Sequence, residues 1–319
     1  MELIEKRLKE LEALVVPQTR QPDFDAFWEE AVRRCREQPL NARGEKLSYP
    51  IAAWEVEDLV FDGLDKTPVY CWRILPPEAQ HAPVPAAIVY HGAGGDRCTP
   101  SAHAAWLAMG MAVVAPDFRM QGGLTGSQTG FRSGSGEGGC FELGLEDKYR
   151  HYFYHTWTDC LRAIEIAIQD PRIDRRRVLV TGGSQGGAAS LAMAALHPEV
   201  SLCCADVPSN CWIEKRIYDA TGGAGRVTAL LRRHPDLIEQ AHVTLSYFDN
   251  LNLAERIRCP TLISVGLKDT ICPPETIYAA CNRIHAPKEI VAYPFGDHGG
   301  GGLVHAERKL AFVRRHFFS

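Results

Sequence analysis

The segment Val-Leu-Val-Thr-Gly-Gly-Ser-Gln-Gly-Gly, residues 178–187, decides the fold of this chain. An apolar, β-type run ends in the pattern G-x-S-x-G, and a helical run rich in alanine, leucine and methionine follows it. A sharp turn between strand and helix lifts the hydroxyl of Ser184 out of a sheet, where a neighbouring base can activate it. Glycines on both sides leave room for that strained backbone. The segment therefore predicts an enzyme with a serine nucleophile.

Length and composition are those of an ordinary globular protein. The chain has 319 residues, of which 45% are hydrophobic and 23% are charged, so it can bury one large core with a small appendage. The formal net charge is −4, and the basic residues are spread along the sequence. This distribution excludes an electrostatic surface for nucleic acid or for an anionic membrane.

Two further features bear on the compartment. The N-terminus is a charged amphipathic pattern without the apolar core of a signal peptide, and no later window approaches the length of a membrane span. The eleven cysteines are an odd number and contain no C-x-x-C pair, which favours small buried thiols in a reducing compartment over paired disulfides. We therefore expect a soluble, cytoplasmic protein.

The order of the expected elements indicates an α/β fold. Two helical stretches, 2–14 and 23–35, lead into the alternating runs 54–61 and 68–75, which predict an antiparallel start to a sheet. Short apolar runs then alternate with helical stretches, and these runs lie at 86–90, 111–115, 178–181, 202–205, 262–265 and 290–293. Strands that are buried on both faces and separated by helices are typical of a mostly parallel central sheet flanked by helices.

Two segments interrupt this alternation. Residues 122–144 are rich in glycine and predict a long loop. Residues 208–256 combine helical and turn-like pieces and predict an inserted helical cap. We therefore expect a single domain over 1–319, with a helical extension at 1–50 and the cap at 208–256.

If Ser184 is a nucleophile, an acid and then a histidine should follow it, each just beyond a later strand. Asp269 follows one expected apolar strand, and His298 follows the next. We expect His298 to take the proton of the serine hydroxyl, and Asp269 to hold the imidazole in the correct tautomer and stabilise its charged form. Asp269 could instead belong to a helix cap, and His298 could be an ordinary loop residue. Asp297 is a rival acid, but neighbouring residues in an extended loop usually point apart.

The tetrahedral intermediate of ester hydrolysis carries an oxyanion that needs two preorganised donors. One is expected at the backbone amide of Gln185, the residue after the nucleophile. The second should come from the loop after 86–90, where Tyr90 or His91 is the candidate and the following glycines let the backbone approach a substrate. These two residues could also be an ordinary strand end before a glycine turn.

Two other patterns carry weaker signals. Residues Gly134 to Gly139 satisfy G-x-G-x-x-G, but they follow no strand and open no obvious helix, so the physical basis for dinucleotide binding is missing. His151 and His155 are four residues apart on an expected helix, a spacing compatible with a metal, but no third ligand is near. We therefore expect neither a cofactor nor a metal. The aromatic residues around these histidines are expected in the core or in a subunit contact, with a sugar-binding face as the alternative.

The chain resembles carbohydrate esterase family seven, the acetyl xylan esterases and cephalosporin C deacetylases of the α/β-hydrolase superfamily. The likeness covers nearly the whole chain, and its most specific pieces are at 182–187, 245–249 and 264–274. It implies the α/β-hydrolase fold, an acetylated small-molecule substrate, no cofactor, and a homo-oligomer that is usually a hexameric ring. The site residues it implies are the triad Ser184, Asp269 and His298, the oxyanion-hole amides of Tyr90 and Gln185, and substrate contacts at Tyr90, Pro208 and Ile271.

Two residues depart from the family pattern. The family's Arg-Gly-Gln is Arg119-Met120-Gln121 here, and its His-Glu pair is His298-Gly299. If the central glycine has a positive φ, methionine there strains the backbone or demands a different loop path. The missing glutamate removes a carboxylate beside His298, which could alter the anchoring of the loop or the pKa of the base.

We therefore expect a serine esterase that hydrolyses acetyl esters of small or medium acetylated alcohols through an acyl-enzyme intermediate. Acetates of xylooligosaccharides are the expected substrates, and cephalosporin C is a further candidate. One alternative is another acyl hydrolase on the same scaffold, such as a thioesterase or a peptidase. The other is a non-catalytic binding protein that keeps the fold.

Overall fold

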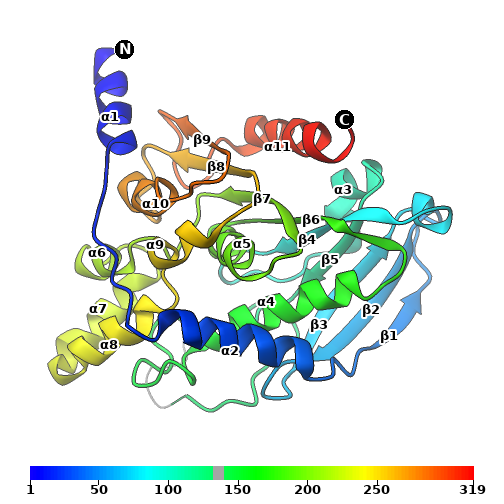
Figure 1. Ribbon diagram of the computed structural model, residues 1–319, viewed down its shortest axis with the longest axis horizontal. Helices are drawn as coiled ribbons and strands as arrows, with labels where there is room; N and C mark the ends of the chain where they lie inside the picture. The colour runs from blue at the N-terminus through cyan, green and yellow to red at the C-terminus, as the bar shows by residue number, and fades with distance from the viewer. Residues whose placement is uncertain (132–139) are drawn as a thin grey trace.

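The computed structural model describes residues 1–131 and 140–319, and within them one mixed sheet of nine strands forms the centre of the fold (Figure 1). The order of the strands is β1-β2-β3-β5-β4-β6-β7-β8-β9. The strands are β1 (Arg43–Leu47), β2 (Glu55–Asp62), β3 (Pro68–Leu75), β4 (Val84–Tyr90), β5 (Ala112–Pro116), β6 (Ile173–Gly183), β7 (Val200–Asp206), β8 (Thr261–Gly266) and β9 (Lys288–Tyr293). The Gly134 to Gly139 pattern lies outside the described residues.

Helices connect these strands and cover both faces of the sheet (Figure 1). The first three are α1 (Glu2–Glu12), α2 (Phe24–Glu37) and α3 (Ala104–Ala108). Between β5 and β8 lie α4 (Tyr152–Ile168), α5 (Gln185–Leu196), α6 (Ile213–Tyr218), α7 (Ala224–Arg233), α8 (Ile238–Ser246) and α9 (Asn250–Leu253). Helices α6 to α9 fall within 208–256, the segment expected as a cap, and are called the cap helices below. The last two are α10 (Pro274–Cys281) and α11 (Gly302–Phe317).

The pairing of the strands is that of the α/β-hydrolase fold. Strands β1, β2, β3 and β5 pair antiparallel in succession, and β4 then pairs parallel with both β5 and β6. The remaining neighbours, β6 to β9, are all parallel. Because the carboxyl ends of parallel strands meet at one edge, loops that are distant in the sequence come together there. The expected mostly parallel sheet is confirmed.

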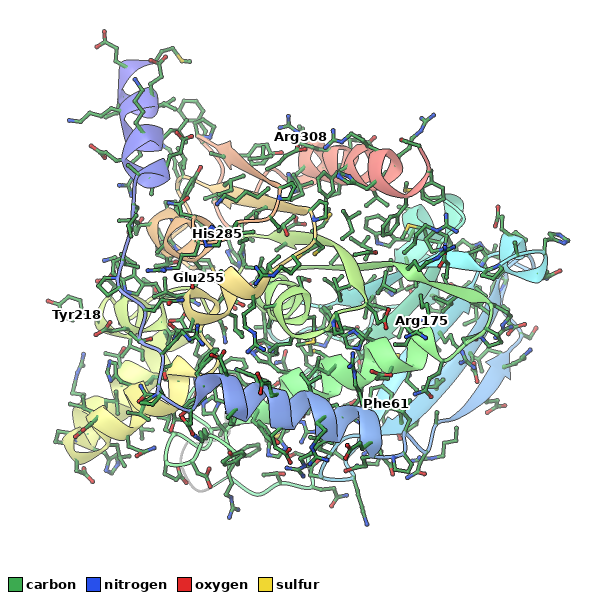
Figure 2. All side chains as sticks on the ribbon, in the orientation of Figure 1. Phe61, Arg175, Tyr218, Glu255, His285 and Arg308 are labelled. Carbon is green, nitrogen blue, oxygen red and sulfur yellow. The ribbon has the colours of Figure 1, made fainter. Side chains whose placement is uncertain are left out.

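Two hydrophobic clusters pack on opposite faces of the sheet. The larger one joins the sheet to α2, α4, α5 and the cap helices, and it includes the fully buried Phe61 of β2 (Figure 2). The smaller one joins the other face to α3 and α11. Strands with both faces covered explain why the sequence shows continuous apolar runs at these positions.

The structure agrees with the expected elements except at the edge of the sheet. The runs at 54–61 and 68–75 are β2 and β3, and the six later apolar runs are β4 to β9. Strand β1 was not expected, because all five of its residues are exposed and carry no apolar alternation. Strand β6 begins at Ile173, earlier than expected. Its first part is rich in charged residues, so the apolar run marks only its second half.

Two expectations about composition can be compared with the structure. All eleven cysteines are free thiols, and all except Cys98 and Cys140 are buried. Across residues 1–131 and 140–319, no helix combines the length and the apolar character needed to cross a membrane.

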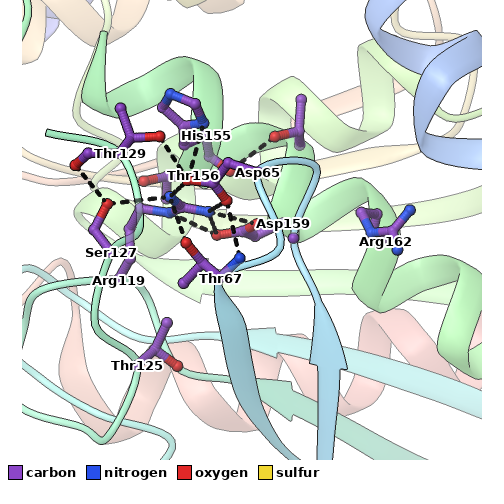
Figure 3. Close-up of polar contacts among 12 residues, drawn as sticks. Asp65, Thr67, Arg119, Thr125, Ser127, Thr129, His155, Thr156, Asp159 and Arg162 are labelled. Carbon is purple, nitrogen blue, oxygen red and sulfur yellow. Dashed lines mark hydrogen bonds and ion pairs between the residues drawn. The ribbon is translucent and has the colours of Figure 1, made fainter. Parts of the chain in front are cut away.

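A buried ion-pair network anchors the loop after β5 (Figure 3). Arg119 is fully buried, and its Nε and Nη2 atoms donate to Asp159 of α4 at 2.9 Å each. Its Nη1 atom donates to Asp65, in the turn between β2 and β3, at 2.9 Å. Thr129, farther along the loop, also donates to Asp65 at 2.6 Å. Burial raises the pKa of Asp65, but the hydrogen bond and charge of Arg119 outweigh this and hold the pKa below its usual value.

Replacing Arg119 with methionine should destabilise the protein by about 3–5 kcal/mol, because two carboxylates in the protein interior lose their counter-ion. Urea-induced unfolding, followed by tryptophan fluorescence, measures this loss. Arg33 is the matched control, since its ion pairs with Glu30 and Glu37 lie on the exposed side of α2. Arg33→Met should therefore leave the unfolding midpoint almost unchanged. Equally small effects of the two substitutions would show that the network does not hold the loop.

Candidate active site

Ser184 occupies the turn between β6 and α5 in a strained backbone conformation. Its φ is 56° and its ψ is −113°, a combination that non-glycine residues rarely adopt. Two hydrogen bonds from the end of β7 hold the turn: the Ser184 amide donates to Asp206 O at 2.9 Å, and the Ser209 amide donates to Ser184 O at 3.0 Å. The side chain is thereby presented at the carboxyl edge of the sheet.

The glycines of the motif let α5 approach the neighbouring strands. A Cβ atom on Gly186 would lie 2.1 Å from Tyr90 O, and one on Gly182 would lie 2.3 Å from the same oxygen. A Cβ atom on Gly187 would lie 2.7 Å from Asp206 O. Because these contacts are to backbone atoms that cannot move aside, any larger residue would push the helix away from the sheet.

His298 and Asp269 are brought together by the loops after β9 and β8. Nδ1 of His298 and Oδ2 of Asp269 are 2.8 Å apart. The carboxylate is buried, and its Oδ1 accepts the amides of Ile271 and Cys272 at 2.8 and 2.9 Å. These contacts fix the ring and direct Nε2 away from Asp269. The rival acid Asp297 instead accepts the amide of Gly299 at 2.9 Å.

Cys272 lies close to the Asp269–His298 pair and to Ser184. Its donor atom and those of Asp269 and His298 all lie within 4.8 Å of one another. Burial raises the pKa of this thiol to about 11, and a contact with the Ser184 hydroxyl acts in the opposite direction. No hydrogen bond joins Ser184 to His298 among the residues that the structure describes. Catalytic hydrogen bonds are often long before a substrate binds, so the lack of a hydrogen bond between Ser184 and His298 is compatible with proton transfer.

A pocket of ≈390 Å³ opens beside Ser184. Ser184 and Gln185 form part of its wall together with Ala93 and Gly94, from the loop after β4, and Ile271, from the loop after β8. Ile271, which was expected as a substrate contact, is therefore part of the wall of this pocket. Pro208 does not line this pocket, whereas its neighbour Ser209 does.

The structure does not bring Tyr90 into this pocket. Tyr90 is the last residue of β4, its side chain is buried, and its hydroxyl donates to Cys160 O at 3.2 Å. The ring of His91 is fixed against Phe118, whose amide donates to it at 2.8 Å. Ala93, three residues beyond Tyr90, lines the pocket, and its amide has no hydrogen-bond acceptor within the described part of the chain. In the sequence, the signal for a close approach of the backbone at Ala93 was the following pair, Gly94-Gly95.

Gln121 links the two loops that carry the expected oxyanion donors. Its Nε2 atom donates to Gln185 Oε1 at 3.1 Å and to Tyr152 OH at 2.8 Å. Its Oε1 atom accepts the amide of Gly94 at 2.8 Å. Gln121 therefore fixes these two loops relative to each other, and its signal in the sequence was its place in the motif Arg119-Met120-Gln121.

Met120, which stands where the family has glycine, has the positive φ that was considered for this position. Its φ is 58°, so this side chain is held in the left-handed region. A hydrogen bond from its amide to Thr125 O, 2.7 Å, holds the loop in this path. Its side chain is exposed and forms part of the pocket wall.

The two histidines at the start of α4, His151 and His155, are part of the packed structure of the fold. His151 caps the helix, because its Nδ1 atom accepts the amide of Phe153 at 3.1 Å. His155 is buried, and burial lowers its pKa to about 4. Neither belongs to a group of three potential metal donors within the ranges that the structure describes.

Comparisons with known proteins find similarity along nearly the whole chain. Residues 1–316 match the family model described as acetyl xylan esterase, AXE1. The solved structure of an acetyl xylan esterase from Paenibacillus sp. R4 is 34% identical, covers 97% of this chain and 99% of its own, and superimposes with a TM-score of 0.92. Acetyl xylan esterase 1 from Thermoanaerobacterium sp. JW/SL YS485 is 29% identical, covers 98% and 99%, and has a TM-score of 0.90.

A curated relative is longer than this chain. Acetyl esterase Axe7A of Xylanibacter ruminicola is 31% identical over an alignment of 297 positions that covers 89% of this chain. The aligned part spans 65% of the length of that relative. Since the family model covers nearly every residue, this chain belongs to the acetyl xylan esterase family of carboxylic ester hydrolases.

Proposed function

We propose that this chain is a serine esterase that removes acetyl groups from acetylated sugars through an acyl-enzyme intermediate. The observation that carries the proposal is the 2.8 Å contact between His298 and Asp269 beside a serine on a strained strand-to-helix turn. This combination matches the parts that serine hydrolases use. Family membership supports acetate as the acyl group and a carbohydrate as the alcohol.

In the first half of the reaction, Oγ of Ser184 attacks the carbonyl carbon of the ester while Nε2 of His298 accepts the hydroxyl proton. The carbonyl electrons move onto oxygen and form the tetrahedral intermediate. The negative charge of Asp269 stabilises the imidazolium through Oδ2. Its other oxygen, Oδ1, accepts two backbone amides, which hold the carboxylate in place. Collapse of the intermediate breaks the bond to the alcohol, which leaves with the proton from His298.

In the second half, water gives a proton to His298 and attacks the acetyl-serine, and the returning proton regenerates Ser184 as acetate departs. The oxyanion of both intermediates is assigned to the amides of Gln185 and Ala93. Ala93 takes the place expected of Tyr90, because it lines the pocket with Ser184 and its amide has no acceptor among the described residues. Preorganised donors of this kind contribute about 10²–10³ in rate each.

Cephalosporin C is a further candidate substrate within this scheme. Cephalosporin C also carries an acetyl ester, and it could react by the same steps. A panel of acetylated xylooligosaccharides, simple sugar acetates and cephalosporin C, scored for released acetate, ranks these substrates.

Ser184→Ala should abolish esterase activity, with kcat lowered at least about 10⁴-fold, because the nucleophile is removed. The wild-type protein should also form a covalent adduct with a fluorophosphonate probe, whereas the variant should not. The Tm should stay within a few degrees, since the hydroxyl contributes little to packing. Intact-protein mass spectrometry and thermal unfolding measure these effects. Wild-type protein that resists the probe, or a variant that is labelled equally, would favour a non-catalytic binding protein.

Hydrolysis of p-nitrophenyl acetate should exceed that of the butyrate and the octanoate, with kcat/KM at least about tenfold lower for octanoate. The reason is that family membership points to an acetyl substrate, and a site shaped for a short acyl group loses transition-state contacts when the chain is longer. Initial rates of p-nitrophenol release measure the order. A preference for octanoate would reject the acetyl assignment and favour another acyl hydrolase on this scaffold.

A further inference from the structure

Arg216, on the short cap helix α6, is a buried cation in the wall of the pocket beside Ser184. Its side chain is 1% exposed, and it lines the pocket together with Ser184, Gln185 and Ile271. Tyr218, two residues later on the same helix, projects into solvent and is 88% exposed (Figure 2). The helix therefore directs one long cation inward while its other side faces water.

The hydrogen-bonding capacity of Arg216 is only partly used. Its Nη2 atom donates to Ile271 O at 3.0 Å and to Thr221 O at 3.5 Å. Its Nε and Nη1 atoms are buried and have no hydrogen-bond partner within the described residues. The guanidinium lies 5.6 Å from the centre of the Phe141 ring. A guanidinium has five N–H donors, and a buried one without a counter-ion is strongly unfavourable.

The acidic groups near Arg216 are bonded elsewhere. Asp249 accepts three backbone amides, and burial raises its pKa to about 7. Asp269 accepts two amides and the ring of His298. Glu142 accepts from Arg226, the other arginine of the pocket wall, at 2.7 Å. The charge of Arg216 acts on Asp249, where it lowers the pKa against the larger effect of burial, but no carboxylate of the described residues makes a hydrogen bond or ion pair with its guanidinium.

The position of Arg216 relates it directly to the catalytic residues. The oxygen that accepts its Nη2 atom belongs to Ile271, whose amide donates to Asp269. The positive charge also lowers the pKa of the Cys272 thiol, against the larger effect of burial, so it acts close to the Asp269–His298 pair. An anion that reaches Arg216 from the pocket lies beside the ester bond rather than on a remote surface.

We infer that Arg216 binds a carboxylate on the alcohol part of the substrate, so that the preferred esters are acetates of acidic sugars. This inference rests on the proposed esterase function. A substrate carboxylate supplies a directly bonded counter-ion that no described residue supplies, and it accepts charge-assisted hydrogen bonds from the guanidinium. Neutral acetates leave the charge of Arg216 unmatched and gain no such contact.

A matched pair of esters tests the inference. Methyl 3-O-acetyl-β-xyloside and methyl 3-O-acetyl-β-glucuronoside differ only in the carboxylate on C5. The wild-type protein should hydrolyse the acidic ester with at least about tenfold higher kcat/KM, and Arg216→Met should lower this ratio at least about tenfold. Arg216→Lys keeps the charge and should keep part of the preference. The ratio should also fall as sodium chloride is raised.

Lys215→Met is the matched control, because Lys215 is the neighbouring cation on α6 and its Nζ atom is paired with Asp219 at 2.7 Å on the exposed side. This variant should keep the wild-type ratio. The Tm of Arg216→Met should be unchanged or higher, since an unmatched buried charge is replaced by an apolar side chain. A wild-type ratio near one, or an Arg216→Met variant that loses activity on both esters equally, would overturn the inference.

Binding without turnover separates the inference from the esterase proposal. Isothermal titration calorimetry with the unacetylated methyl glucuronoside and methyl xyloside offers no bond for the enzyme to hydrolyse. The wild-type protein should bind the acid at least about tenfold more tightly than the neutral sugar, and Arg216→Met should bind both equally. Selective binding without any esterase activity would reject the proposed reaction alone. Ester hydrolysis with equal binding of the two sugars would reject only the role of Arg216.

Discussion

The close approach of α5 to the backbone of β4 is the constraint on which the site depends. Cβ atoms on Gly182 and Gly186 would lie 2.3 and 2.1 Å from the same carbonyl oxygen of Tyr90, so the helix begins at a distance that no other residue type allows. The chain can make this turn only by placing Ser184 in a strained conformation, with a φ of 56°. A hydrogen bond to Asp206 O opposes the release of that strain. The nucleophile is therefore positioned by backbone contacts, before any catalytic side chain is considered.

The loops around this turn are fixed mainly by polar contacts. Gln121 reaches both Gly94 and Gln185, so the two loops that carry the proposed oxyanion donors cannot move independently. The preceding Arg119 is fully buried between carboxylates of α4 and of the turn between β2 and β3, and it anchors Gln121 to the body of the fold. On the opposite side, Asp269 uses one oxygen to shape its own loop and the other to hold the histidine. Such networks are most favourable when all members are satisfied, and here Nε2 of Gln185 is a buried donor without a partner among the described residues.

The sequence predicted those parts of the fold and site that depend on local pattern. Buried parallel strands produce apolar runs, and Asp269 and His298 each follow one, so their positions could be inferred without coordinates. Strand β1 has no buried face and hence no such pattern. Tyr90 was expected as an oxyanion donor because it ends a strand, and this stays a prediction. The sequence did not single out our alternative, Ala93, because the path of the loop that brings Ala93 to the pocket depends on contacts such as the one between Gly94 and Gln121. Arg216 had no local signal, because its environment arises only when the cap packs on the sheet.

The residues around the pocket are held in two different ways. The turn at Ser184 beside the pocket is held by backbone contacts, whereas other residues of the pocket lining have side chains that are held at a cost in free energy. Met120 keeps a left-handed conformation that costs roughly 1 kcal/mol or more, and it forms one wall. Arg216 forms another wall and keeps a buried charge without a carboxylate partner in the described chain. Neither cost is needed for the turn at Ser184, so packing of the fold does not account for them. Costs of this kind persist when a bound group offsets them, and selection for a particular alcohol would therefore act on these walls while the turn at Ser184 stays unchanged.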